Sequence, residues 1–207
     1  MREKGITLLD IDRVVFDTDS FERMLYDKMS EQTGLNAEKL NEMRLEYRAK
    51  IIGYPIASLI DYIAKETKTD LSELQETLQD KNIYKRFIFS DVKKALTLLS
   101  RDSRLGAFTS GNENDQTNKM SSVINFFEKD LIFIAENKLE DEFLDKIPDR
   151  ATIIDDRKRV IQVLYTKDRF NLIQLDRDKN SGEKIDLKGV PTVRNLIECA
   201  EIVLRAV

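Results

Sequence analysis

The chain has 207 residues, of which 41% are hydrophobic and 35% charged, and its formal net charge is only −4. This composition excludes a disordered chain or a fibre, and the interspersed charges leave no basic stripe that would bind nucleic acid. The sequence contains no histidine, which excludes serine–histidine and cysteine–histidine catalysis and zinc sites with histidine ligands. Any chemistry must therefore use carboxylates, lysine, hydroxyl groups or a hard metal ion.

A short apolar run at residues 5–11 predicts a buried first strand that ends in acidic residues. The segment that follows contains no convincing strand and several helical patterns in succession. One pattern follows Pro55, a favoured residue of the first helical turn, and another begins with Asp70 and Glu73, spaced as in a capping box. We therefore predict an all-helical cap over residues 19–89.

From residue 90 onward, apolar runs of strand length alternate with amphipathic helical patterns. The predicted strands cover residues 105–108, 131–135, 151–154 and 171–175, and the predicted helices cover residues 92–99, 139–147, 160–164 and 196–207. Such alternation is typical of a parallel sheet with helices on both faces. The predicted fold class is α/β, a Rossmann-like three-layer α/β/α parallel sheet over residues 1–18 and 90–207, with the helical cap inserted after its first strand.

The compartment follows from what the sequence lacks. The single cysteine, Cys199, rules out an internal disulfide, fits a reducing compartment, and stands in an apolar segment that predicts a buried structural thiol. The first residues lack the apolar run of a signal peptide, and no stretch approaches the ~20 apolar residues of a membrane helix. We expect a cytoplasmic protein with no membrane and no nucleic-acid partner.

Polar side chains follow three predicted strands at their carboxyl ends. Asp10 and Asp12 follow the first strand, residues 109–112 follow the second, and Asp155 and Asp156 follow the fourth. Ligands of an open parallel sheet bind outside these ends. Carboxylates gathered there raise one another's pKa unless a cation compensates, and Mg²⁺ suits a site of a few carboxylates with water and phosphate. Each acidic pair alone is better explained as a helix cap or turn. The combination at three strand ends favours chemistry.

The order of these features resembles the haloacid dehalogenase-like hydrolases. Residues 8–18 resemble the first motif of that superfamily, an apolar strand followed by D-x-D-G-T-L-x-D-[ST], and residues 105–112 look like the second, an apolar strand ending in Ser or Thr. Lys138 is placed like the lysine of the third motif, and residues 152–157 match the fourth in its paired-acid form. The resemblance covers the whole predicted α/β part, and the helical insert resembles the cap that many members carry.

The resemblance implies a role for each matched side chain. Asp10 would attack phosphorus and form a phospho-aspartate, and Asp12 would protonate the leaving oxygen and then activate water. Thr109 would hydrogen-bond a phosphoryl oxygen, and Lys138 would neutralise charge on Asp10 and on the phosphoryl group. Two nearby lysines compete for that last role: Lys129 and Lys146.

The resemblance also implies Mg²⁺ as the cofactor. Its ligands would be Asp10, the backbone carbonyl of Asp12, and the pair Asp155 and Asp156. Which member of that pair is the inner ligand stays open. The partner would be a small phosphorylated substrate, bound by a monomer or a homodimer.

The first motif departs from the family pattern at Arg13 and Val14, which stand where Gly-Thr is usual. Val14 cannot donate the hydrogen bond by which the threonine hydroxyl fixes the loop, and Arg13 replaces a flexible residue. Two functions follow: a Mg²⁺-dependent phosphatase of a small metabolite, or a phosphate- or metal-binding regulatory module that has lost useful turnover. In the second case, restoring Gly-Thr should raise activity.

Two other activities fit less well. A response-regulator receiver domain uses similar groups in another order: an acid pair after its first strand, a lone phospho-accepting Asp after the third and a lysine after the fifth. In this chain the D-x-D pair comes first, the adjacent acids come late, and the lysine precedes them. Dehalogenation requires neither Asp12 nor a metal, yet the sequence supplies both Asp12 and the later acidic pair.

Overall fold

The structure is a computed structural model that describes residues 4–51, 55–177 and 186–206. Six parallel strands form one sheet in the order β3-β2-β1-β4-β5-β6. The strands are β1 (Gly5–Leu9), β2 (Ser103–Ser110), β3 (Ile132–Ala135), β4 (Thr152–Asp155), β5 (Asn171–Leu175) and β6 (Thr192–Val193). The first five confirm the predicted strands, whereas β6 was not foreseen, because two residues carry no readable periodicity.

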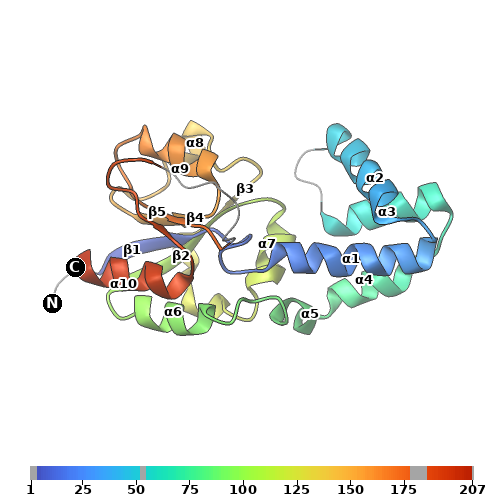
Figure 1. Cartoon of the computed structure of the whole chain (residues 1–207), viewed down its shortest axis with the longest axis horizontal. Coiled ribbons are helices and arrows are strands. Elements are labelled where there is room, and N and C mark those ends of the chain that lie inside the picture. The colour runs from blue at the N-terminus through green and yellow to red at the C-terminus, as the bar shows by residue number, and fades with distance from the viewer. Residues whose placement is uncertain (1–3, 52–54, 178–185, 207) are drawn as a thin grey trace.

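Helices cover both faces of this sheet, which confirms the predicted three-layer α/β/α class. The α-helices are α1 (Thr18–Thr33), α2 (Ala37–Lys50), α3 (Ile56–Thr67), α4 (Ser72–Gln79), α5 (Lys81–Lys85), α6 (Val92–Leu99), α7 (Glu113–Met120), α8 (Asp141–Leu144), α9 (Lys158–Tyr165) and α10 (Leu196–Ala206), and two short 3₁₀ turns are η1 (Ile124–Phe126) and η2 (Lys129–Leu131). Figure 1 shows α8 and α9 on one face, α6 and α10 on the other, and α1 running from the sheet toward α2, α3 and α4.

Alternating side chains of the strands build a separate core on each face. Leu9 and Ile154 pack in the larger cluster, with α6, α10 and the helices that follow β1, whereas Leu8 and Ile153 pack in the smaller cluster with α9. This is the period of two expected for strands buried on both sides. It explains why the strands read as continuous apolar runs.

Between residues 18 and 85 the described part of the chain forms five α-helices, α1 to α5, and no strand, as predicted. The start of α4 differs from the capping-box expectation, because Asp70 accepts a hydrogen bond from the backbone of Ser72, where the helix begins. The helix predicted over residues 139–147 is shorter and ends at Leu144. Pro148 disfavours helical backbone at the residue before it, so the chain turns there. The division into a cap domain of residues 19–89 and a core domain of residues 1–18 and 90–207 stays a prediction.

No helix in the described ranges is long and apolar enough to cross a membrane. Cys199 lies on α10 and is fully buried, as predicted, and burial raises the pKa of its thiol. We therefore expect the native chain to resist modification by 5,5′-dithiobis(2-nitrobenzoate) and to react after unfolding in guanidinium chloride. Rapid reaction of the native chain would show that α10 opens readily or that the thiol is exposed.

Candidate active site

The acidic residues meet at the carboxyl edge of the sheet because β1 lies between β2 and β4. Leu9 is paired with Ala107 on one side and with Ile154 on the other, so Asp10 and Asp155 lie on adjacent strands at the same level. The backbone N–H of Asp10 continues the ladder by donating to the carbonyl of Ile154 at 2.9 Å. The predicted gathering of these acids is thus what the register produces.

Lys138 is a buried cation at this edge. Its Nζ atom lies 2.9 Å from Oδ1 of Asp10 and 2.6 Å from Oδ2 of Asp155, and it donates to the carbonyl of Phe108 at 3.0 Å. The side chain is fully buried, which a lysine tolerates only when it is paired in this way. The two competing lysines, Lys129 and Lys146, are exposed.

Asp10 lies at the floor of the site and is 2% exposed. Its Oδ1 atom forms an ion pair with Lys138 but accepts no hydrogen bond within the described part of the chain. Burial raises the pKa of Asp10, an effect that the charge of Lys138 opposes and the charge of Asp155 strengthens. A buried carboxylate oxygen without a hydrogen bond is a candidate ligand for a cation.

Asp155 and Asp156 are held differently. Asp155 directs Oδ2 to Lys138 and accepts the backbone N–H of Arg157 on Oδ1 at 2.9 Å. The carboxylate of Asp156 has no hydrogen bond or ion pair among the described residues, and burial, together with the charges of Asp10 and Asp155, raises its pKa to about 8. Asp156 is therefore the one of the two whose oxygens are available.

The three carboxylates fit a hard divalent cation. Asp10, Asp155 and Asp156 each offer an oxygen, and these atoms lie within 4.8 Å of one another. Lys138 compensates only one of their three negative charges. Oxygen ligands with an uncompensated negative charge suit Mg²⁺ or Ca²⁺ rather than a soft metal.

Asp156→Asn tests this metal site. In EDTA the variant should melt at a higher temperature than the parent chain, because it removes a carboxylate whose charged form is disfavoured by burial beside Asp10 and Asp155. Mg²⁺ at about 100 times its Kd should raise the melting temperature of the parent by roughly 5–10 °C, but not that of the variant. Differential scanning calorimetry with and without Mg²⁺ measures both effects. Asp149→Asn, on the surface beside Arg169, is the matched control, and an unresponsive parent chain would contradict the site.

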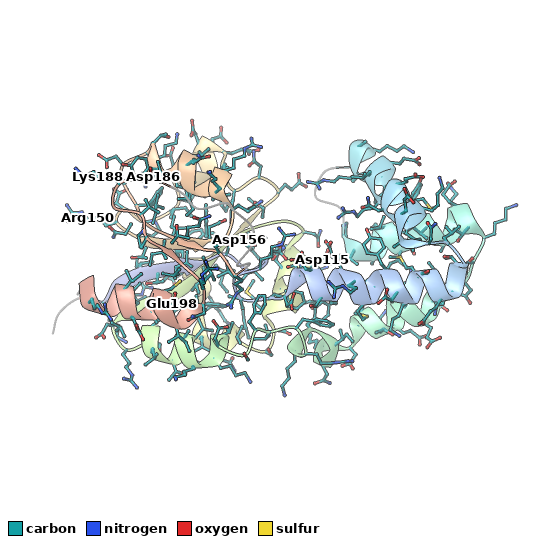
Figure 2. The ribbon with its side chains drawn as sticks, in the orientation of Figure 1. Asp115, Arg150, Asp156, Asp186, Lys188 and Glu198 are labelled. Carbon is teal, nitrogen blue, oxygen red and sulfur yellow. The ribbon has the colours of Figure 1, made fainter. Side chains whose placement is uncertain are left out.

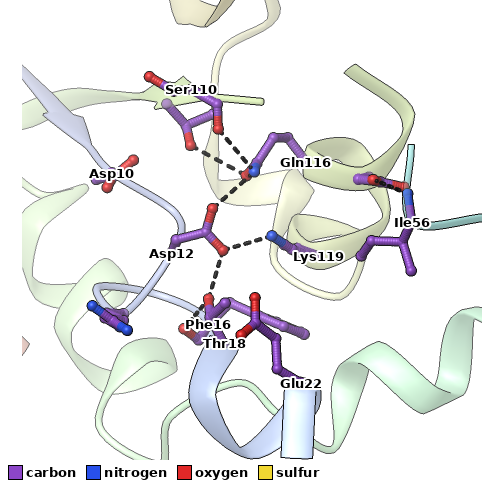
Figure 3. Close-up of polar contacts among 12 residues, drawn as sticks. Asp10, Asp12, Phe16, Thr18, Glu22, Ile56, Ser110, Gln116 and Lys119 are labelled. Carbon is purple, nitrogen blue, oxygen red and sulfur yellow. Dashed lines mark hydrogen bonds and ion pairs between the residues drawn. The ribbon is translucent and has the colours of Figure 1, made fainter. Parts of the chain in front are cut away.

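Asp12 is held by a set of residues that sequence reasoning missed (Figure 3). Its Oδ1 atom accepts from Thr18 Oγ1 at 2.5 Å and from Lys119 Nζ at 2.6 Å, and its Oδ2 atom accepts from Gln116 Nε2 at 2.9 Å. Burial alone would raise the pKa of Asp12, but the charge of Lys119 and these hydrogen bonds lower it below its ordinary value. The signal available in the sequence was the spacing of Gln116 and Lys119, which places them on one face of α7.

The two hydroxyl groups at the end of β2 are placed differently from expectation. Thr109 is fully buried and donates its hydroxyl hydrogen bond to Oε1 of Gln116, so it supports the residue that holds Asp12. Ser110, the next residue, lines the cavity beside Asp10. Successive side chains of a strand point to opposite sides, which is why one residue decides which hydroxyl reaches the site.

Another residue supplies the hydrogen bond that is lost because Val14 stands where a threonine is usual. Val14 is fully buried in the core, and Thr18 donates the hydrogen bond to Asp12 that Val14 cannot. Arg13 has a left-handed backbone with φ of 60°, which favours glycine. Arg177 secures the loop by donating to the carbonyls of Arg13 at 3.2 Å and Val14 at 2.7 Å, while its guanidinium is paired with Asp91.

These side chains surround a cavity of about 120 Å³. Its lining residues are Asp10, Asp12, Arg13, Thr18, Ser110, Asp156 and Arg157. A larger hollow of about 460 Å³ lies at the amino ends of the strands, next to Gly5 and Ser103. Figure 2 shows Arg150 and Lys188, which line that hollow, at the far end of the molecule from Asp156 and Asp115. The smaller cavity is the candidate active site, because it contains Asp10, Asp12 and Asp156 of the sheet edge.

Comparisons with known proteins identify the fold. No family model and no curated protein matches the sequence. A putative haloacid dehalogenase-like hydrolase from Burkholderia xenovorans LB400 has a similar structure, with a TM-score of 0.76, 16% identity, and coverage of 99% of this chain and 98% of that chain. A putative HAD-hydrolase from Bacillus subtilis, bound to magnesium, has a TM-score of 0.64 at 15% identity, covering 97% and 99%. A HAD phosphatase from Thermococcus onnurineus has a TM-score of 0.60 at 16% identity, covering 96% and 97%.

Proposed function

We propose that this chain, whose fold is that of the haloacid dehalogenase-like hydrolases, is a Mg²⁺-dependent phosphatase of a small phosphorylated metabolite in the cytoplasm. The observation that carries the proposal is the buried Lys138 between Asp10 and Asp155, with the free carboxylate of Asp156 beside them. A nucleophilic carboxylate, a fixed cation and a metal-binding pair are the groups that phosphoryl transfer through an aspartate requires.

The residues have these roles in the proposal. Asp10 attacks phosphorus, so that a bond forms between its carboxylate oxygen and phosphorus while the bond to the leaving oxygen breaks. Asp12 gives a proton to the leaving oxygen and then takes one from the water that cleaves the phospho-aspartate. Lys138 compensates the charge of Asp10, and Ser110, which lines the cavity, takes the role that the sequence assigned to Thr109 and hydrogen-bonds a phosphoryl oxygen.

Mg²⁺ would be held by Asp10, the Asp12 carbonyl and Asp156, with Asp155 behind Asp156. Asp155 is the outer member because Lys138 and the Arg157 N–H already occupy its oxygens. When bound, the metal would neutralise negative charge on the phosphoryl oxygens. The helical region between β1 and β2 would act as the cap that excludes water.

A second candidate is a phosphate- or metal-binding regulatory module. The observation that favours it is the occupation of both Asp12 oxygens by Thr18, Gln116 and Lys119. A carboxylate held in this way and with a lowered pKa gives up its role as a proton donor unless the contacts rearrange.

Hydrolysis of 4-nitrophenyl phosphate with Mg²⁺ and with EDTA tests the phosphatase proposal. We expect Mg²⁺-dependent release of nitrophenol. Absence of turnover with this and other phosphate esters, in a chain that binds Mg²⁺, would favour the regulatory module.

Lys119→Met distinguishes the two candidates. If Lys119 positions Asp12 for catalysis, kcat should fall by about 10- to 100-fold, with partial recovery in Lys119→Arg. If the contacts lock Asp12 in an inactive module, the same variant should gain activity. Steady-state kinetics give the answer, and circular dichroism verifies that each variant is folded.

A further inference from the structure

Each of the two acidic motifs is followed directly by an arginine. Arg13 follows Asp12, and Arg157 follows Asp156. Because β1 and β4 are neighbours in the sheet, both arginines come to the same edge. Both line the 120 Å³ cavity with Asp10 at its floor, and neither has a role in the proposed phosphoryl transfer.

The arginines lie at the mouth of the cavity. The side chain of Arg13 is 56% exposed and that of Arg157 is 46% exposed, whereas Asp10 is 2% exposed. A cavity of this size is far below the ~300–1,000 Å³ of a pocket that encloses a drug-sized ligand. It has room for the transferred group, so the rest of a substrate must extend past the two guanidinium groups.

Stability gives little reason for either side chain. Arg13 is paired with Asp19, whose side chain is 57% exposed, and an exposed pair of this kind contributes little to folding. The left-handed backbone of Arg13 is strained for any residue with a Cβ. Arg177 holds the loop through the backbone carbonyl of residue 13, so the Arg13 side chain is not needed for that contact. Arg157 Nε lies 3.8 Å from an Asp155 oxygen that already accepts a backbone N–H.

We propose that Arg13 and Arg157 form a subsite for a second anionic group of the substrate, a carboxylate or a phosphate carried by the leaving group. The inference rests on the proposed function, because the transferred phosphoryl group occupies the cavity floor. The flat guanidinium group donates two parallel hydrogen bonds to such anions and keeps its charge at all relevant pH values. Two of them at one mouth select for negative charge in the part of the substrate that leaves.

Calorimetric titration with three phosphonates tests the subsite without any turnover. The titrations are made in the presence of Mg²⁺. Besides its phosphonate, phosphonoacetate carries a negative carboxylate, propylphosphonate carries no second charged group, and 2-aminoethylphosphonate carries a positive ammonium group. We expect the parent chain to bind phosphonoacetate at least about tenfold more tightly than propylphosphonate, and 2-aminoethylphosphonate most weakly. Methylenediphosphonate then distinguishes the source of the anion, since tighter binding than phosphonoacetate assigns a phosphate and weaker binding a carboxylate.

Arg13→Gln and Arg157→Gln should each reduce the affinity for phosphonoacetate by about fivefold to tenfold and change that for propylphosphonate by less than about twofold. Arg159→Gln is the matched control, because it removes an exposed arginine two residues away that does not line the cavity. Equal affinities for the charged and neutral phosphonates would overturn the subsite alone. Absence of binding by every phosphonate would overturn the proposed phosphatase and the subsite with it.

Discussion

Asp10→Asn should reduce Mg²⁺-dependent phosphatase activity by at least about 10⁴-fold, the range seen when a covalent nucleophile is removed. The amide nitrogen and oxygen are poor nucleophiles, and the variant cannot form the phospho-aspartate. Lys138 would keep its partner Asp155 at 2.6 Å, so the fold should survive the change. Single-turnover kinetics with 4-nitrophenyl phosphate measure the loss, and mass spectrometry of the quenched parent chain should locate the phosphoryl group on Asp10.

Asp130→Asn is the control for this experiment. Asp130 is exposed, pairs with Arg104 and lies outside the cavity, so its loss should leave activity within about twofold, as expected for surface substitutions. Activity of Asp10→Asn within tenfold of the parent chain would exclude Asp10 as the nucleophile and with it the proposed reaction.

Lys138→Met should both abolish activity and destabilise the chain. Removal of Lys138 leaves Asp10 and Asp155 buried without their common cation, and breaking a buried pair of this kind costs about 3–5 kcal/mol. For a chain of this size the melting temperature should fall by roughly 6–20 °C. Thermal unfolding in EDTA is the appropriate measurement, because a bound cation would partly replace the missing charge.

The competing lysines supply matched controls for that prediction. Lys129→Met and Lys146→Met remove exposed charges and should change stability by less than about 0.5 kcal/mol. The double variant Lys138→Met/Asp155→Asn should recover part of the lost stability, because it removes one of the two buried charges left unpaired. A Lys138→Met chain as stable as its parent would mean that the ion pairs do not form.

The sequence alone predicted the five longer strands and the acids at the ends of β1 and β4, but neither β6 nor the order of the strands in the sheet. Strands β1, β2, β4 and β5 place buried side chains on both faces, whereas the edge strand β3 is only partly buried. Each of the five still appears as an apolar run, and Asp10 and Asp155 stand directly at the ends of two of these runs. Lys138 follows no apolar pattern of its own, and only the family resemblance identified it. Asp10 and Asp155 could be predicted because each stands, in the sequence, at the end of the strand that positions it in the structure.

The residues that the sequence did not identify act across long separations. Lys119 and Gln116 contact Asp12 from more than 100 positions away. In the sequence they belong to a polar helix, α7, whose side chains read as facing solvent. Arg177 contacts the backbone of residues 13 and 14 rather than any side chain that a motif would record. Thr109 and Ser110 differ by one position, and one position reverses the direction of a strand side chain.

The central place of β1 in the sheet has a consequence for synthesis. Gly5 is paired with Ser103 and Thr7 with Thr152, so the partners of β1 are synthesised about 100 and 145 residues after it. Pairings this distant in the chain form slowly. The strand that leads to Asp10 is therefore translated well before either of its partners in the sheet. Until those partners emerge, this apolar strand has no sheet to pair with, and unpaired apolar strands are prone to aggregate.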